Sequence, residues 1–212
     1  MAVRNLKSKL RKEIQLILKN IDQNIIMEET ENVINQIIND PIFKNSKTIS
    51  IFVSTAGEIM TDRLIRHSLE NKKKVFIPYF ERNSEKMEML FLPSIDIFNE
   101  LPKNFYGIRQ YNKEIIDKIS SNLFNNEKVN DISYKTYGPL DLLICPLVAA
   151  SRDGCRLGHG KGYYDKFLQE HLNIFSKIPI TYGLALNCQV KENNEIPMDS
   201  NDYKLDKIFY SC

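Results

Sequence analysis

Residues 152–167 read Arg-Asp-Gly-Cys-Arg-Leu-Gly-His-Gly-Lys-Gly-Tyr-Tyr-Asp-Lys-Phe, and the rest of the chain is organised around this stretch. Glycines alternate with other residues over positions 158–162, and Arg156 and Lys161 lie among them. Glycine adopts positive φ values without a Cβ clash, so successive backbone N–H groups can turn inward. Such groups at the start of a helix attract anions, and nearby cations strengthen the attraction. The stretch therefore predicts a phosphate-binding loop that leads into a helix.

The glycine spacing separates this loop from the common nucleotide-binding motifs. It lacks the GxxxxGK[ST] pattern of a P-loop, and its G-x-G-x-G spacing is not the GxGxxG of a dinucleotide fold. A glycine-rich connection without any ligand is the alternative. The interleaved cations Arg156 and Lys161 favour the phosphate site.

Strands and helices alternate on both sides of the loop. Apolar or β-rich runs predict strands at 48–53, 75–80, 86–92, 141–146, 180–186 and 206–210. Apolar residues at helical spacing predict helices at 4–20, 27–38, 61–71, 112–122 and 160–172. We expect an ordered loop over 93–111 and a surface insertion over the asparagine-rich tract 121–138.

This order of elements predicts a three-layer α/β/α fold around a mostly parallel, mixed sheet. No internal repeat or linker divides the chain, so we expect a single domain over residues 1–212. Ligands of such sheets bind beyond the carboxyl ends of the strands. The glycine loop follows strand 141–146 and Glu58 follows strand 48–53, so both are expected at that edge.

Composition and charge exclude several classes of protein. With 29 basic and 27 acidic residues the net charge is +2, which does not indicate the strongly basic surface expected of a protein that binds nucleic acid. No run of 18 apolar residues is present, so no transmembrane helix is expected. The four cysteines are far apart, which indicates neither a zinc site nor disulfides and fits a reducing compartment. Cys155 is read as a passive thiol within the loop.

The N-terminal residues bear on localisation. They lack the continuous apolar segment of a secretory signal, so we expect a cytoplasmic protein. The first twelve residues are basic and contain no acid, which leaves mitochondrial targeting open beside an ordinary first turn of a helix. On that helix Lys7 and Arg11 lie four residues apart and share one side. They form either a solvated face or a pair aimed at an anion.

Other side chains near the loop are candidates for binding a metal or a phosphate. Asp165 lies in the first turn of the predicted helix, where it either complements the helix dipole or holds Mg²⁺ beside a phosphate. Asp199, Asp202 and Asp206 cluster late in the chain, either as solvated acids or with one of them completing a metal site. His159, between two glycines, either contacts phosphate or is simply exposed. No Ser-His-Asp or Cys-His arrangement supports a covalent nucleophile.

Aromatic and sulfur-containing side chains offer a surface for a flat ring. Tyr163 and Tyr164 follow the last glycine of the loop, where they either pack in the core or stack on a ligand. The same alternatives apply to a second group of residues: Tyr79, Phe80, Met87, Met89 and Tyr106.

The segment from Arg156 to Asp165 closely resembles the signature of the 5-formyltetrahydrofolate cyclo-ligase family, also called methenyltetrahydrofolate synthetases. The resemblance continues in order along nearly the whole chain. Residues 7–11 are similar to the family's basic N-terminal motif, 49–52 and 58–61 to its first strand and folate-contacting acid, 76–78 and 87–89 to its next strands, and 201–206 to its closing segment. It implies a Rossmann-like fold related to that of sugar-phosphate isomerases.

The resemblance implies an ATP- and Mg²⁺-dependent cyclisation of 5-formyltetrahydrofolate to 5,10-methenyltetrahydrofolate. ATP phosphorylates the formyl oxygen, N10 attacks the activated carbon, and phosphate leaves as the ring closes, with ADP as the other product. This chemistry needs positioning and charge neutralisation more than a covalent nucleophile. The implied partners are ATP and the folate, with or without a polyglutamate tail. We expect a monomer that binds neither nucleic acid nor membrane.

Residue roles follow from the resemblance by position. ATP is expected to contact Lys7, Ser8, Lys9, Leu10, Arg11, Arg156, Leu157, Gly158, His159, Gly160, Lys161, Gly162, Tyr163 and Tyr164. The folate is expected to contact Glu58 at the pterin edge, and also Phe52, Tyr106, His159, Gly160, Lys161, Gly162 and Tyr163. The expected catalytic residues are Lys161, Arg156 and Tyr163, and the expected Mg²⁺ ligands are Asp165 and Asp202.

Two features depart from the family pattern. The family commonly has arginine where this chain has His159, and a neutral imidazole attracts phosphate less and changes charge near neutral pH. The tract 121–138 has no counterpart. Two other functions remain open: a non-catalytic nucleotide or folate binder, and a sugar-phosphate-isomerase-like enzyme. The presence of both Asp165 and Asp202 argues against the first, and the basic N-terminal helix argues against the second.

Overall fold

The computed structural model describes residues 2–81, 84, 86–105, 107–123 and 131–211. Within these residues the main sheet has six strands in the order β3-β2-β1-β4-β7-β9. The strands are β1 Thr48–Ile51, β2 Lys74–Tyr79, β3 Glu88–Leu92, β4 Leu142–Cys145, β7 Ile180–Leu184 and β9 Lys207–Phe209. Every pairing is parallel except that between β2 and β3. The predicted mostly parallel, mixed sheet is confirmed, and an antiparallel strand forms one of its edges.

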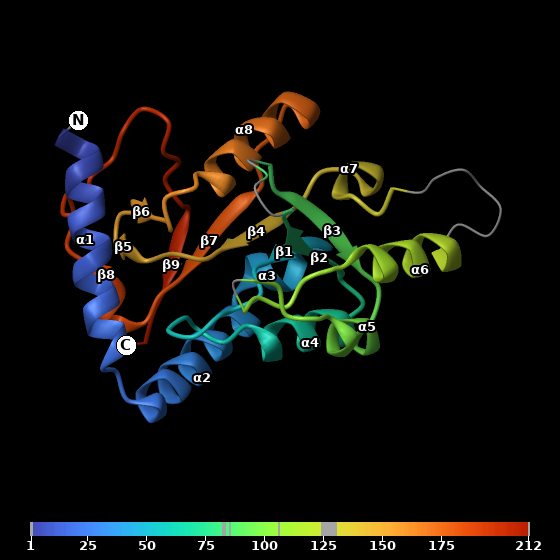
Figure 1. The fold of residues 1–212 in the computed structure, drawn as a ribbon, viewed down its shortest axis with the longest axis horizontal. Helices are drawn as coiled ribbons and strands as arrows, with labels where there is room; N and C mark the ends of the chain where they lie inside the picture. Colours follow the sequence, from blue (N-terminus) through green and yellow to red (C-terminus); the bar gives the residue numbers. More distant parts are fainter. Residues whose placement is uncertain (1, 82–83, 85, 106, 124–130, 212) are drawn as a thin grey trace.

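Helices cover both faces of this sheet (Figure 1). Helix α8 lies on one side and helices α2 and α4 lie on the other, which confirms the three-layer prediction. Strand β4 is fully buried along its length, as its continuous apolar sequence predicts for a strand covered on both faces. The helices are α1 Ala2–Lys19, α2 Gln23–Asn39, α3 Pro41–Asn45, α4 Asp62–Glu70, α5 Ile95–Glu100, α6 Lys113–Leu123, α7 Tyr134–Tyr137 and α8 Tyr163–Phe175, with a 3-10 turn at Asn187–Gln189.

Three short helices occur where the sequence did not predict them. After α2 ends at Asn39, Asp40 accepts hydrogen bonds from the N–H groups of Ile42 and Phe43 and starts α3, with Pro41 in its first turn. Helix α5 replaces part of the expected loop, and α7 lies in the expected insertion, whose residues 124–130 fall outside the described residues. Each of these two helices is capped by a serine, and both are too short to show a helical period.

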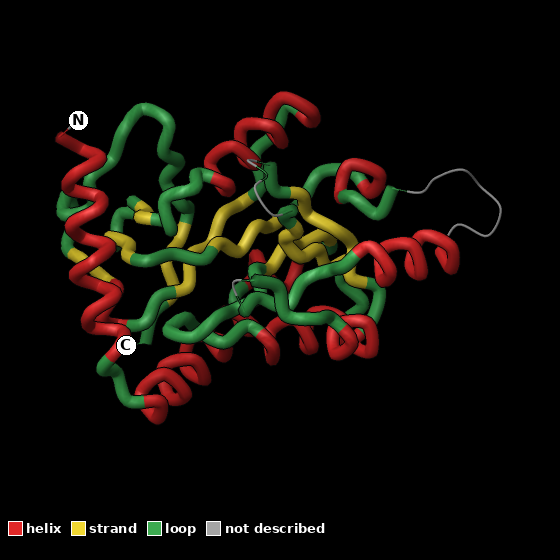
Figure 2. The backbone as a smooth tube through the Cα atoms, viewed as in Figure 1, coloured by secondary structure: helices red, strands yellow, loops and turns green. Residues whose placement is uncertain are grey.

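A small second sheet separates β4 from the glycine loop, and no sequence pattern predicted it. Its strands are β5 Ala149–Ser151, β6 Arg156–Leu157 and β8 Val190–Lys191, in the order β6-β5-β8. Figure 2 shows α1 lying beside this sheet. Ile14 of α1 is fully buried in an apolar cluster with Val148 and Leu157 from the sheet region. This packing anchors the basic N-terminal helix beside the glycine loop.

The start of α8 differs from the prediction by three residues. Gly160 and Gly162 have φ values of 100° and 67°, which are not helical, so the helix begins at Tyr163 rather than at Gly160. None of the described helices is both long enough and apolar enough to span a bilayer.

Gly154, in the turn between β5 and β6, approaches the C-terminal segment closely. Its φ is 90°, its carbonyl accepts the N–H of Leu205 at 2.8 Å, and an added Cβ would lie 2.1 Å from the carbonyl oxygen of Leu205. We expect Gly154→Ala to destabilise the protein by at least about 3 kcal/mol, because a backbone collision adds to the strain of a positive φ. Urea unfolding measures the effect. Gly138→Ala is the control, since Gly138 has a φ of 95° but nothing within 4 Å of its added Cβ. Equal losses in the two variants would contradict the account.

Candidate active site

A cleft of about 1400 Å³ lies at the carboxyl ends of β1, β2 and β4. Residues after β1 form one wall, and α1, the glycine loop and the 199–203 segment form the others. The expectation that the glycine loop and Glu58 meet at this edge is therefore confirmed. Of the expected site residues, those lining the cleft are Lys7, Arg11, Phe52, Glu58, Arg156, Leu157, Gly158, His159, Gly160, Lys161, Gly162, Tyr163, Tyr164, Asp165 and Asp202.

Three of the expected residues that the structure describes do not line the cleft. Ser8 and Lys9 are exposed on α1, and Leu10 packs against the apolar cluster that contains Ile14. A helix turns by about 100° per residue, so residues between Lys7 and Arg11 point elsewhere. These three side chains therefore do not line the cleft, and the ATP contacts expected of them stay a prediction. Tyr106 lies outside the described residues.

The glycine loop brings cations to an open helix end. Gly162 caps α8 without a side-chain hydrogen bond, so the N–H groups of the first turn keep their capacity to bind an anion. Arg11 donates from Nε to the carbonyl of Gly158 at 2.8 Å, and a Cβ on Gly160 would lie 3.4 Å from the Arg11 guanidinium carbon. Lys161 is exposed and makes no hydrogen bond or ion pair with any described residue. These features fit the predicted anion site.

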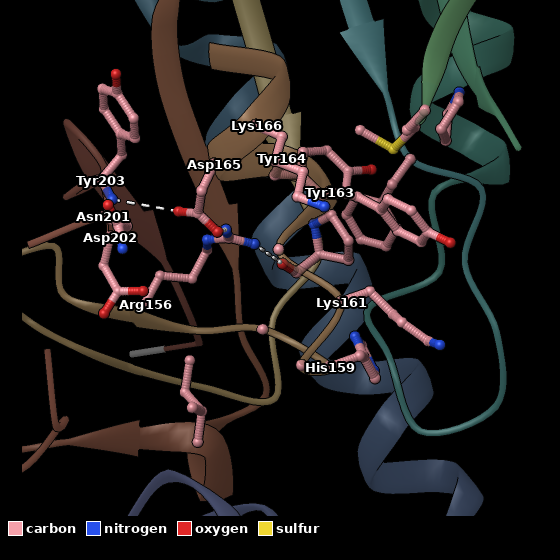
Figure 3. Close-up of a pocket in the computed structure, with 18 of the residues that line it drawn as sticks. Arg156, His159, Lys161, Tyr163, Tyr164, Asp165, Lys166, Asn201, Asp202 and Tyr203 are labelled. Carbon is pink, nitrogen blue, oxygen red and sulfur yellow. Dashed lines mark hydrogen bonds and ion pairs between the residues drawn. The ribbon is translucent and has the colours of Figure 1, made fainter. Parts of the chain in front are cut away.

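Arg156 and Asp165 form an ion pair beneath the loop. The guanidinium Nη2 lies 3.0 Å from Oδ2 of Asp165, and the two side chains are 5% and 20% exposed. Oδ1 of Asp165 accepts the N–H of Tyr203 at 3.2 Å (Figure 3). Arg156 also lies over the ring of Tyr164, 5.5 Å from its centre. The pair thus links the small sheet, the start of α8 and the C-terminal segment.

Lys7 bridges two further carboxylates. Its Nζ lies 2.7 Å from Oδ2 of Asp199 and also contacts Oδ2 of Asp202. Burial alone would lower the pKa of Lys7, but the bonds to these two carboxylates outweigh it and raise the pKa. Lys7 therefore remains a cation at one end of the cleft.

The acids of the cleft are compatible in kind with Mg²⁺ bound together with phosphate. The described residues contain no group of three His, Cys, Asp or Glu placed to hold a metal by themselves. Mg²⁺ carried with a nucleotide needs only one or two carboxylates beside the phosphate oxygens. Asp165 and Asp202 both line the cleft, and Tyr203, whose N–H binds Asp165, directly follows Asp202.

Glu58 and His159 face each other across the cleft. Their Oε1 and Nε2 atoms are 3.8 Å apart, and Oε2 of Glu58 accepts both the N–H of Thr55 at 2.7 Å and its hydroxyl at 3.1 Å. Burial raises the pKa of Glu58 to about 7 despite these two bonds. Desolvation, with the positive charges of Arg156 and Arg11, lowers the pKa of His159. His159 is thus neutral at pH 7, which weakens its expected contact with phosphate.

The raised pKa of Glu58 links its ionisation to stability. Between pH 4.5, the ordinary value, and about 7 the unfolded chain loses a proton that the folded protein keeps, so stability falls as pH rises through this window. We expect Glu58→Gln to be more stable than wild type above pH 7, by up to about 3 kcal/mol, with the difference gone below pH 4.5. Urea unfolding at pH 4 and pH 8 measures this. A difference that is the same at both values would show that Glu58 is not held protonated.

Aromatic rings form the wall beside Glu58. Tyr163 stacks on Phe80 with ring centres 5.6 Å apart, and its hydroxyl donates to the carbonyl of Ser84 at 2.8 Å. Phe80 and Met87 line the cleft, whereas Met89 is buried in the core. Tyr164 is buried as a packing residue that still borders the cleft. A flat ring can therefore lie against Tyr163 and Phe80.

Some residues of the cleft were not anticipated. Thr55 donates two hydrogen bonds to Glu58 and so fixes its carboxylate. The sequence signal for this contact was a threonine three residues before an acid in a turn. Arg4 extends the basic side of α1 along the cleft, at helical spacing from Lys7. Ile108 and Tyr203 come from irregular segments, where no local pattern indicates which side chain faces a ligand.

Comparisons with known proteins place this site in a family. The model of the 5-formyltetrahydrofolate cyclo-ligase family matches residues 3–211. The chain belongs to this family. It is 39% identical over 210 residues to a probable 5-formyltetrahydrofolate cyclo-ligase of Caenorhabditis elegans, covering 99% of this chain and 94% of that protein. The mouse 5-formyltetrahydrofolate cyclo-ligase is 30% identical over 208 residues, covering 98% of this chain and 95% of the relative.

The fold also matches that of a solved structure from the family. The NMR structure of Aquifex aeolicus 5,10-methenyltetrahydrofolate synthetase matches with a TM-score of 0.69 and 25% identity, over 96% of this chain and 89% of that one. The resemblance drawn from the glycine loop is thus confirmed at the level of both family and fold.

Proposed function

We propose that the protein converts 5-formyltetrahydrofolate to 5,10-methenyltetrahydrofolate with ATP. The observation that carries this is a single cleft in which an open, cation-rich helix end lies beside the buried acid Glu58. A phosphate-binding surface and a group that can recognise a pterin therefore face the same space. Membership of the cyclo-ligase family supports the assignment.

In the proposed reaction the formyl oxygen attacks the terminal phosphorus of ATP, and ADP leaves. N10 then forms a bond to the activated carbon, the carbon–oxygen bond breaks, and the former formyl oxygen departs as part of inorganic phosphate. The N10 proton is released to solvent. The phosphoryl transfer and the final release of phosphate both move negative charge on phosphoryl oxygens, so fixed cations are the main requirement.

The proposed catalytic residues are Lys161, Arg156 and Tyr163. Lys161 extends into the cleft from the loop and neutralises charge on the transferred phosphoryl group. Arg156 is fixed under the loop by Asp165 and by the carbonyl of Pro146 at 3.3 Å, so its charge stays at the loop's base. Tyr163 holds the folate ring against Phe80. Lys7 and Arg11 bind the remaining phosphates from α1.

Glu58 is proposed to bind the pterin edge, where a carboxylate can accept two parallel N–H groups. Such donors stabilise its ionised form, so folate binding lowers the pKa from about 7 and releases part of a proton at neutral pH. His159 lies at this end of the cleft beside Glu58, between the two substrates.

Asp165 and Asp202 are proposed to hold Mg²⁺, which would supply additional positive charge to the phosphates of ATP. We further propose that the chain acts as one domain and as a monomer, without nucleic acid or membrane partners. The folate substrate carries or lacks a polyglutamate tail. A cytoplasmic location is also proposed. It is supported by the basic residues of α1 that line the cleft, because the site then accounts for their charge without a role in mitochondrial targeting.

One assay tests this proposal. The purified protein is mixed with 5-formyltetrahydrofolate, ATP and Mg²⁺, and the near-ultraviolet absorbance of the methenyl product is followed. We expect a rise that disappears when either ATP or Mg²⁺ is omitted. If both ligands bind in calorimetry but absorbance does not change, the protein is a non-catalytic binder.

A further inference from the structure

A four-residue turn from Asp199 to Asp202 closes one end of the cleft. The N–H of Asp202 donates to the carbonyl of Asp199 at 3.2 Å, and Oδ1 of Asp199 accepts the N–H of Asn201 at 3.0 Å. The residues of this turn all line the cleft. The expected metal ligand Asp202 is therefore presented by a turn that Asp199 organises.

Asp199 also contacts both functional neighbours of the turn. Its carboxylate Oδ2 accepts Lys7 Nζ at 2.7 Å, and its backbone N–H donates to Oδ2 of Asp202 at 2.7 Å. Lys7 contacts that same oxygen of Asp202. Within the described chain, Oδ1 of Asp202 accepts no hydrogen bond, so one oxygen of this carboxylate is occupied and the other is open.

The charges explain why two acids are needed here. Lys7 is only 9% exposed, and a buried ammonium requires a counter-charge nearby. If Asp202 were its only partner, their charges would cancel and Asp202 would attract a divalent cation weakly. With Asp199 present, one negative charge compensates Lys7 and the other remains on Asp202.

We propose that Asp199 is a positioning residue that takes up the charge of Lys7 and thereby keeps Asp202 available to a metal-bound nucleotide. This inference rests on the proposed function, because the nucleotide and metal are those of the cyclo-ligase reaction. It gives Asp199, which the sequence grouped with Asp202 and Asp206 as a solvated acid or a metal ligand, the separate role of a charge partner for Lys7.

The test is Asp199→Asn. Asparagine has the same shape, retains the turn through its side-chain oxygen and keeps the backbone N–H to Asp202. Its amide NH2 takes the place of Oδ2, so the negative charge and the hydrogen bond that Oδ2 accepts from Lys7 are lost together. We expect Mn²⁺ affinity, measured by electron paramagnetic resonance with a non-hydrolysable ATP analogue, to fall about five- to twentyfold by Coulomb's law at this range. The KM for ATP should rise by a similar factor, with the folate KM and kcat within about twofold of wild type.

Two variants serve as controls. Asp199→Glu keeps the charge and should recover most of the Mn²⁺ affinity. Glu13→Gln removes an exposed acid from the same helix as Lys7, where Glu13 pairs with Lys191 at 3.0 Å, and should leave every constant unchanged.

Two outcomes would overturn the inference. One is wild-type Mn²⁺ affinity and ATP KM in Asp199→Asn, which would make Asp199 a turn residue only. The other is an equal loss for both substrates together with lower stability, which would indicate a general structural defect. Absence of turnover in the wild-type protein would instead reject the proposed function, and the Mn²⁺ measurement would still decide the role of Asp199.

Discussion

Replacing Lys161 with alanine is expected to lower the kcat of ATP-dependent methenyl formation about a thousandfold while the protein stays folded. Lys161 lines the cleft from the loop that leads into the open N-terminal end of α8, and it makes no hydrogen bond or ion pair with any described residue. Its removal leaves no buried partner unpaired, so stability should change by less than about 0.5 kcal/mol. The lost charge is one that the transferred phosphoryl group needs in the transition state.

The absorbance assay and a thermal melt separate these effects. Lys161→Arg keeps the charge and should recover part of the rate, although a planar guanidinium does not replace a compact ammonium fully. Lys12→Ala removes an exposed lysine of α1 that does not line the cleft and should behave as wild type. Undiminished turnover in Lys161→Ala would remove this residue from the site.

Asp165→Asn is the second change with a large expected effect. We expect kcat/KM for ATP to fall at least about a hundredfold, because the variant loses a proposed metal ligand and the counter-charge of Arg156. Arg156 is only 5% exposed, so its unpaired charge should also destabilise the fold by about 1–3 kcal/mol. The amide oxygen can still accept the N–H of Tyr203, which limits the structural loss.

The metal dependence distinguishes the two causes of this loss. If Asp165 holds Mg²⁺, the variant should show weaker Mn²⁺ binding in the presence of an ATP analogue at a temperature where it remains folded. Asp141→Asn, which alters an acid bound to the N–H groups of Lys47 and Thr48 outside the cleft lining, tests destabilisation alone. Normal Mn²⁺ affinity in Asp165→Asn would limit Asp165 to supporting Arg156.

The main sheet could be predicted from the sequence because its central strands are apolar or β-rich runs. Strand β4 is the clearest case, since Leu142–Cys145 is buried on both faces and reads as uninterrupted hydrophobic sequence. The strands of the second sheet have only two or three residues, too few to show an alternation of apolar and polar residues in the sequence. Helices α5 and α7 were missed for the same reason of length.

The site was predictable where its chemistry is local in the chain and was missed where it depends on packing. The glycine loop carries its own signal in its residue types. The pairing of Lys7 with Asp199 joins positions 192 residues apart, so no local pattern reveals it. The contact of Glu58 with His159 likewise depends on the order of β1 and β4 in the sheet. ATP contacts were expected from Ser8 and Lys9 because both lie within the basic N-terminal motif, whereas the turn of the helix points their side chains away from that of Lys7.

The central claim is that ATP phosphorylates the formyl oxygen in this cleft, and oxygen labelling tests it most directly. The protein is supplied with 5-formyltetrahydrofolate carrying ¹⁸O in the formyl group, together with ATP and Mg²⁺ in ordinary water, and the released phosphate is analysed by mass spectrometry. The account predicts one ¹⁸O atom in each phosphate, formed in step with the methenyl product. Unlabelled phosphate, or product that forms equally well without ATP, would contradict it.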